Sequence, residues 1–153
     1  MTRQFSVGIV SAAAMMLSTI ASAQQGAQQA KAMLDKAVAA VKADQAVALG
    51  MFNKGEGGFR EGDLYPFCFR AADGKTVASP LAVRSGTDVR TLKDSNGSAY
   101  GVELYAASQK PEGQVTQISD YLFPKPGTTA PSFPKVSFVT KVGELVCGVG
   151  YYK

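Results

Sequence analysis

The chain has 153 residues, a formal net charge of +4 and no histidine. The lack of histidine excludes Ser-His-Asp and Cys-His catalysis, HExxH zinc sites and CxxCH haem attachment, because each needs an imidazole. The 16 Lys and Arg residues are scattered singly, so the charge pattern does not indicate nucleic-acid binding. We therefore expect no enzyme activity, no metal site and no cofactor.

The first 23 residues have the three parts of a secretory signal peptide. Arg3 provides a positive start, Phe5 to Ile20 is a largely apolar run, and Ala21-Ser22-Ala23 is an A-x-A cleavage site. A membrane anchor is the alternative, but the run is shorter than the roughly 20 residues that span a bilayer. We expect cleavage after Ala23, a periplasmic or secreted bacterial location, and one domain over residues 24–153.

Residues 24–52 predict a long amphipathic helix. The segment is rich in Ala, Gln, Lys and Met and has no proline. Apolar residues recur at steps of three and four, which is typical of a helix with one buried face. They are Ala30, Met33, Leu34, Ala37, Val38 and Val41, followed by Val47, Ala48 and Met51. We expect this face to pack on a sheet; pairing with a second copy of the chain, as a homodimer, is the alternative.

A β-hairpin is predicted next. Residues 64–70 alternate, so Tyr65, Phe67 and Phe69 share one face and Cys68 lies on the other. Asp73-Gly74 is a strong turn signal, and residues 76–78 form a short return strand.

The rest of the chain predicts a short helix and three strands. Residues 79–96 read as a loop, residues 100–109 as a short helix, and residues 124–134 as a proline-rich connection. Asp94 to Gly97 resembles the start of a calcium loop, but Tyr105 stands where an EF-hand needs glutamate, so we interpret it as a turn. Strands are expected at 114–123, 135–142 and 145–152. This order indicates an α+β domain built around an antiparallel sheet.

Several short motifs, in this order and spacing, resemble those of the single Cache domain family. They are Gly58-Phe59, Gly62-Asp63-Leu64-Tyr65, Ala72-Asp73-Gly74-Lys75, Leu92-Lys93-Asp94 with Gly97, Pro134-Lys135-Val136-Ser137-Phe138-Val139 and Val146-Cys147-Gly148-Val149-Gly150-Tyr151-Tyr152. The resemblance implies a PAS-like fold, with a long N-terminal helix beside a five- to six-stranded antiparallel sheet. It also implies an extracytoplasmic sensor domain that binds a small organic acid or amino acid. Ser79-Pro80 departs from the His-Pro of many relatives, so no role is carried over to Ser79.

The resemblance further implies a ligand pocket on the concave side of the sheet. An apolar wall with a few polar groups suits a small ligand, and an ammonium can hold a carboxylate. The candidate ligand-binding residues are Tyr65, Phe67, Tyr100, Tyr121, Lys135 and Tyr151. The alternative is that the aromatic residues are plain core and that Lys135 is a solvated strand end.

Cys68 and Cys147 lie on the first and last strands, which are neighbours in the resembling fold. An exported protein with an even number of cysteines favours a disulfide between them. Two buried free thiols are the alternative.

Two functions remain open from the sequence. The first is an exported binding module that captures a small organic anion or amino acid. We expect no transmembrane helix or signalling domain after Tyr152, so a membrane receptor or kinase would have to carry a signal further. The second is a structural or interaction protein with a Cache fold and no ligand, which pairs through its N-terminal helix.

Overall fold

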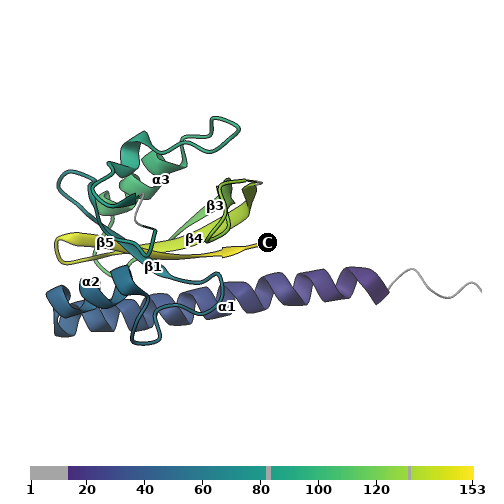
Figure 1. Cartoon of the computed structure of the whole chain (residues 1–153), viewed down its shortest axis with the longest axis horizontal. Coiled ribbons are helices and arrows are strands. Elements are labelled where there is room, and N and C mark those ends of the chain that lie inside the picture. The colour runs from purple at the N-terminus through teal and green to yellow at the C-terminus, as the bar shows by residue number, and fades with distance from the viewer. Residues whose placement is uncertain (1–13, 82–83, 131) are drawn as a thin grey trace, which may run out of the picture.

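The computed structural model describes residues 14–81, 84–130 and 132–153. Helices α1 (Ala14–Ala43) and α2 (Gln45–Lys54) cover one face of a five-stranded antiparallel sheet, and the layer that contains α3 (Tyr100–Ala106) covers the other (Figure 1). The expected α+β architecture is confirmed. Residues 1–13 of the predicted signal peptide lie outside the described residues, and residues 14–23 form the start of α1.

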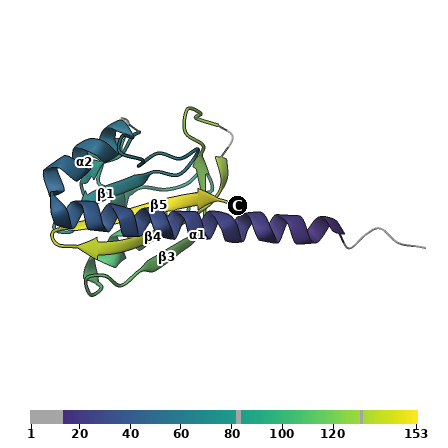
Figure 2. The same ribbon diagram turned by 90° about the horizontal axis from the view of Figure 1, so that it is seen from below.

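Helix α1 carries the predicted apolar stripe. Figure 2 shows it lying lengthwise along the sheet, over β5 (Leu145–Tyr152) and β4 (Ser132–Val142). Ala30, Met33 and Leu34 are buried in one cluster with Val136 and Val149 of these strands. Among residues 14–81, 84–130 and 132–153, no helix is both long and apolar enough to cross a membrane.

The prediction of one helix over residues 24–52 was wrong at Asp44. This residue has an extended backbone (φ −157°), and its carboxylate accepts a hydrogen bond from Val47 N at 3.0 Å, as an N-cap of α2. The break changes the direction of the chain, so Val47 is 57% exposed and does not continue the stripe. Gly55, with φ of 68°, ends α2 in the left-handed conformation that glycine adopts without strain.

The hairpin forms as predicted, from β1 (Pro66–Arg70) and β2 (Thr76–Ala78). In the turn, Gly74 has φ of 71°, and the Asp73 carboxylate accepts a hydrogen bond from Lys75 N at 3.1 Å.

The loop that follows the hairpin contains a 3₁₀ turn at Val89–Thr91, and α3 continues into a second 3₁₀ turn at Ala107–Gln109. The predicted short helix at residues 100–109 is therefore confirmed.

The strand order is β2-β1-β5-β4-β3, so the first and last strands lie side by side in the middle. The outer strand β3 spans Thr116–Pro124. Strand β4 begins three residues earlier than predicted, because Ser132 to Pro134 pair with the end of β3. Because β3 also includes Pro124, the proline-rich connection is limited to residues 125–131 instead of the expected 124–134.

A β-bulge in β3 controls which side chains reach the upper face of the sheet, which is the face covered by the α3 layer. The register passes from Ile118 opposite Ser137 to Tyr121 opposite Lys135, so β3 holds one extra residue there. Asp120 occupies the bulge with φ of 61°, the one non-glycine residue with positive φ in the described part of the chain. Because of the extra residue, Ile118 and Tyr121 join the same core cluster under α3.

Cys68 and Cys147 face each other across β1 and β5 and form a disulfide. Both are completely buried, in the cluster between the sheet and the α1–α2 pair. The bond expected from the sequence is thus present, on the face of the sheet away from α3. It closes a sequence separation of 79 residues and joins the hairpin to the last strand.

Candidate functional site: a cavity between the sheet and α3

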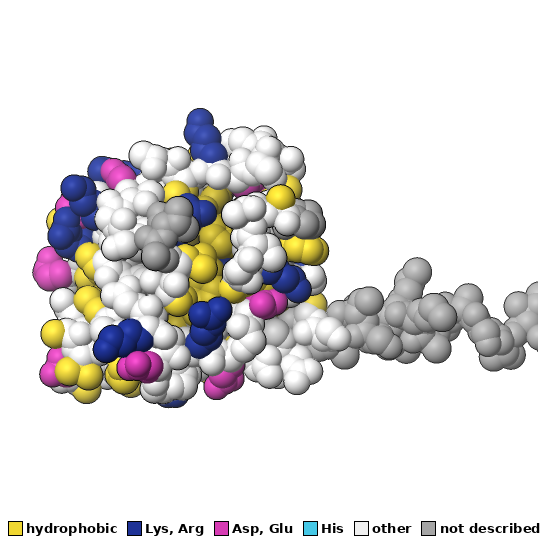
Figure 3. Space-filling view, in the orientation of Figure 1, with side chains coloured by type: hydrophobic (Ala, Val, Ile, Leu, Met, Phe, Trp, Pro, Cys, Tyr) yellow, Lys and Arg dark blue, Asp and Glu magenta, His cyan; other side chains and the backbone are white. Residues whose placement is uncertain are grey.

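A small cavity lies between the upper face of the sheet and the α3 layer. The space open to the centre of a water-sized molecule is about 50 Å³. Figure 3 shows apolar side chains in a recess on this side of the molecule. The lining residues are Tyr65, Phe67, Thr76, Ser79, Leu81, Arg84, Val89, Leu92, Tyr100, Leu104, Tyr121, Phe123 and Lys135.

Two glycines of β5 make room for this cavity. A Cβ on Gly148 would lie 2.6 Å from the ring of Phe67, and a Cβ on Gly150 would lie 2.5 Å from Cε of Lys135. Real Cβ atoms do not approach other atoms so closely, so the side chains of β1 and β4 extend over β5 because these two positions are glycine.

Asp94 connects the loop before α3, which covers the cavity, to the sheet through hydrogen bonds. Its carboxylate accepts hydrogen bonds from Asn96 N and Ser98 N at 2.9 Å, and from Leu122 N of β3 at 3.0 Å. These backbone donors, led by Leu122, hold the pKa of Asp94 below its usual value. The predicted turn therefore has a structural role, as it joins the loop before α3 to the outer strand.

Lys135 is buried in this cavity. Its side chain is 3% exposed, and its Nζ donates a hydrogen bond to the Tyr65 hydroxyl at 3.2 Å. Nζ also lies 4.6 Å from the ring centre of Tyr65, 4.7 Å from that of Phe123 and 4.9 Å from that of Tyr152. No carboxylate of the described residues forms an ion pair with it. The alternative of a solvated strand end is therefore wrong.

Burial lowers the pKa of Lys135 from 10.5 to about 7. Desolvation is the largest cause, since it penalises the charged ammonium, and the nearby Arg84 charge acts in the same direction. The Asp63 carboxylate opposes them but is weaker, and it is already paired with Lys125 at 3.4 Å. The cavity therefore contains an amine with no anionic partner.

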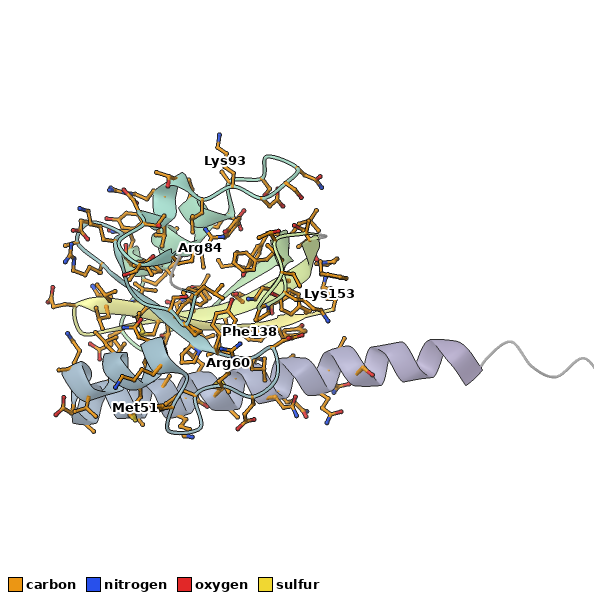
Figure 4. All side chains as sticks on the ribbon, viewed as in Figure 1. Met51, Arg60, Arg84, Lys93, Phe138 and Lys153 are labelled. Carbon is orange, nitrogen blue, oxygen red and sulfur yellow. A yellow bond between two sulfur atoms is a disulfide. The ribbon has the colours of Figure 1, made fainter. Side chains whose placement is uncertain are left out.

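Arg84 brings a second positive charge to the cavity. Its guanidinium lies 4.8 Å from the ring centre of Phe123, and Figure 4 shows the residue between the α3 layer and the sheet. In the described part of the chain no carboxylate pairs with it. Sequence reasoning missed Arg84, because it lies in a loop without periodicity. The sequence of such a loop does not indicate whether an arginine side chain points into a cavity or into solvent.

Two tyrosines form one wall. The rings of Tyr100 and Tyr121 stack with centres 4.3 Å apart and planes 11° apart. The Tyr121 hydroxyl shares a hydrogen bond of 2.6 Å with the buried Ser137 hydroxyl. The Tyr100 hydroxyl is buried and makes no well-formed hydrogen bond among the described residues. The nearby Arg84 guanidinium, through its charge and a weak hydrogen bond, limits the rise that burial causes in the Tyr100 pKa. A buried hydroxyl whose hydrogen bonding is incomplete can bind a ligand oxygen.

The structure brings together five of the six candidate residues: Tyr65, Phe67, Tyr100, Tyr121 and Lys135 line the cavity. Tyr151 lies on the opposite face, where its ring stacks on Phe138 at 6.0 Å and packs beside Gly26 of α1. The next residue, Tyr152, lies on the cavity side instead. Side chains alternate along a strand, so a shift of one residue exchanges the faces. Ser79, at the position that departs from many relatives, also lines the cavity.

The chain was compared with known proteins. The model of the family described as single Cache domain 2 matches residues 1–152. The chain belongs to this family. It has no significant match among curated proteins.

Solved structures with the same fold include chemotaxis and chemosensory proteins. A methyl-accepting chemotaxis protein from Vibrio parahaemolyticus is 24% identical, with a TM-score of 0.65 over 88% of this chain and 92% of that one. A periplasmic sensor domain of a chemotaxis protein is 24% identical, with a TM-score of 0.62 over 92% and 99%. A Cache chemosensory domain whose structure explains carboxylic acid recognition is 20% identical, with a TM-score of 0.61 over 90% and 97%.

Membership of the Cache family agrees with three expectations from the sequence. Cache domains are ligand-sensing domains, they act without catalysis, and they lie outside the cytoplasm. The Cys68–Cys147 disulfide fits that location, because such bonds persist in oxidising compartments.

Proposed function

We propose that this Cache domain binds a carboxylate of two or three carbons in the cavity between the sheet and α3, with Lys135 and Arg84 as its cationic contacts. The observation that carries the proposal is the buried amine of Lys135, which has no anionic partner in the described residues and stands beside a second cation. Leaving an ammonium buried and unpaired is costly, so an arriving carboxylate would supply the missing partner.

The volume of the cavity sets the size of this ligand. A water molecule needs about 10–15 Å³ of such space. The cavity of about 50 Å³ therefore accommodates a molecule of roughly three to five non-hydrogen atoms. Acetate and propionate fall in this range, pyruvate is larger than the range by one atom, and still larger organic acids fit only if the α3 layer moves.

The charges of the lining favour a simple carboxylate over an amino acid. An amino acid also carries an ammonium group, which needs an acceptor or a negative charge. None of the lining residues is acidic, and two are cationic. The ammonium of a bound amino acid would therefore face Lys135 and Arg84 without a carboxylate to balance it.

We further propose that the protein is exported to the periplasm or secreted, with cleavage after Ala23, and that it presents its ligand to a membrane receptor or kinase. Carboxylic acid recognition by one structural neighbour supports the ligand class.

The alternative function is that of a structural protein that pairs through its N-terminal helix and binds no ligand. We favour ligand binding, because the apolar stripe of α1 is already packed against the sheet.

A thermal-shift screen at pH 6.5 tests this function. A ligand that binds only the native state raises the melting temperature. We expect acetate, propionate or pyruvate to do so, and we expect their uncharged amides, acetamide and propionamide, to have no effect at equal concentration. Alanine and glycine serve as matched amino acids and should act less than the acids. A shift with the amides equal to that with the acids would overturn the ionic contact.

A further inference from the structure

We propose that carboxylate binding in this cavity is coupled to the uptake of one proton by Lys135, so that the protein binds its ligand more weakly as the surroundings become alkaline. The inference rests on the proposed function and adds a regulation to that same site. It starts from the position of Lys135 Nζ, which has one hydrogen-bond acceptor, the Tyr65 hydroxyl, and no carboxylate partner among the described residues.

In the empty cavity, the surroundings favour the neutral amine. Three aromatic rings within 5 Å of Nζ stabilise the ammonium. Full burial and the Arg84 charge act against it, and they outweigh the rings and the more distant Asp63, so the pKa of Lys135 falls to about 7. At slightly alkaline pH, Lys135 is therefore a neutral amine in most molecules of the ligand-free protein.

A bound carboxylate reverses this balance. An opposite charge at hydrogen-bond distance favours the ammonium and raises the pKa of a lysine toward its ordinary value. A ligand that meets the neutral amine must then draw a proton from solvent onto Nζ. The balance is simple: one proton enters with each anion, no bond is made or broken in the ligand, and the charge of the cavity stays unchanged.

The other charged or ionisable groups that face Lys135 are four tyrosines, Arg84 and Asp63. Burial raises the pKa values of the neighbouring tyrosines above their usual value, so these hydroxyls move further from neutral pH. Asp63 forms an ion pair with Lys125. Helix α1 packs on the opposite face, and the chain contains no histidine. The tyrosines are Tyr65 before β1, Tyr121 on β3, Tyr152 on β5 and Tyr100 on α3.

The coupling predicts a specific pH dependence. Below about pH 6.5 Lys135 is already charged, so the Kd is constant. Above pH 7 the Kd rises up to tenfold per pH unit, or about 50- to 100-fold between pH 7 and 9. Proton uptake per bound ligand is about 0.1 at pH 6 and about 0.8 at pH 7.5.

Isothermal titration calorimetry with acetate, propionate and pyruvate tests the coupling. These acids stay ionised from pH 6 to 9. At pH 7.5, titrations in HEPES and in Tris give heats that differ by the number of protons taken up times the difference in the ionisation enthalpies of the buffers. We expect about 0.8 proton for the wild type. Lys135→Arg, whose guanidinium stays protonated, should take up none.

The outcomes separate this inference from the proposed function. Binding with a constant Kd from pH 6 to 9 and equal heats in both buffers would overturn the coupling and leave the function intact. Binding of none of the three acids would overturn both. A pH dependence that persists in Lys135→Arg would assign the proton to another group.

A second measurement does not depend on how that variant behaves. In wild-type protein with ¹³C-labelled lysine, the Cε resonance of Lys135 should titrate near pH 7 without ligand and well above pH 8 with saturating acetate or pyruvate. Its absence from spectra of Lys135→Met assigns it. Titration near 10 in the free protein would overturn the inference.

Discussion

Gly150 lies directly beneath the side chain of Lys135, so that a Cβ on Gly150 would come within 2.5 Å of Lys135 Cε. The two residues belong to neighbouring strands, and the missing side chain on β5 lets the lysine stem lie across the sheet into the cavity. The position of the amine thus depends on a glycine in the partner strand.

Gly150→Ala should therefore weaken ligand binding. Its methyl group would displace Lys135, or the Ser137 hydroxyl, which also lies 2.5 Å from the Cβ position. Loss of a charge-assisted contact of about 1.5–3 kcal/mol corresponds to a Kd raised about 10- to 150-fold. Calorimetric titration with the carboxylate found in the screen measures the change.

Gly50→Ala is the matched control for this variant. Gly50 lies in α2 with no atom within 4 Å of its Cβ position, so alanine fits there and removes a weak helix former. Its Kd should equal that of the wild type. An unchanged Kd in Gly150→Ala as well would show that the lysine does not need the space above β5.

The stability of the fold should depend on pH through Lys135. The pKa of this lysine is about 7 in the folded protein and about 10.5 when unfolded. Between these values the unfolded chain binds more protons, so the free energy of unfolding rises with pH by up to about 1.4 kcal/mol per unit. Below pH 7 the full cost of burying the ammonium remains, so Lys135→Met should be the more stable protein there.

Urea denaturation of the wild type and Lys135→Met at pH 6, 7, 8 and 9 measures this effect. The difference in unfolding free energy should be largest at pH 6 and should shrink as the pH rises from 7 to 9. Comparing the two proteins cancels the groups that they share. A difference that stays constant over the four pH values would contradict the burial of a titrating lysine.

The sequence predicted most of the fold because its periodic patterns are long and local. The alternation in residues 135–142 and the Asp73-Gly74 turn each specify an element through neighbours in the chain. The break at Asp44 was missed, because an N-cap inside a run of good helix formers looks like an exposed polar residue. The extension of β4 was missed for a similar reason, since its first residues depend on pairing with distant Leu122 to Pro124.

The candidate site was predictable where side chains alternate on strands, as for Phe67 and Lys135. Tyr151 and Tyr152 show the limit of this reasoning, because two adjacent tyrosines differ only in the face they take, and the register with β4 decides it. The direction of Arg84 depends on a loop held in place by contacts far along the chain. The bulge at Asp120, which turns Tyr121 toward the cavity, also has no local signal.

Removal of the disulfide should destabilise the protein without affecting the site. In the chain-entropy model, a bond that closes a 79-residue separation contributes about 4–5 kcal/mol. The double variant Cys68→Ala with Cys147→Ala should therefore lower the melting temperature by about 10–15 °C. Differential scanning calorimetry measures this loss.

Ligand affinity provides the control for the double variant. The bond lies on the α1 side of the sheet and the cavity on the other, so Kd at 20 °C should stay within about twofold of the wild type. An unchanged melting temperature in the variant, or in the reduced wild type, would show that the cross-link does not stabilise the fold.

Export should leave Gln24 as the first residue. Among the α1 side chains that the structure describes, from Ser22 onward, the first fully buried one is Ala30, so cleavage after Ala23 keeps the contacts of the buried stripe with the sheet. Mass spectrometry of the protein from the periplasm or culture medium measures the mature mass. Ala23→Asp should block processing, because the cleavage site needs a small residue. An intact Met1 in the exported wild type would rule out the predicted site.

Calorimetric titration of the wild type and Lys135→Met at pH 6.5, with the carboxylate that gives the largest thermal shift, tests the ionic contact at Lys135 most directly. At this pH the lysine is charged, so its removal should raise the Kd about 10- to 150-fold. Lys141→Met, on the same strand but outside the cavity lining, should bind like the wild type. Equal affinities for Lys135→Met and the wild type would contradict the account, since the buried amine would then not contact the ligand.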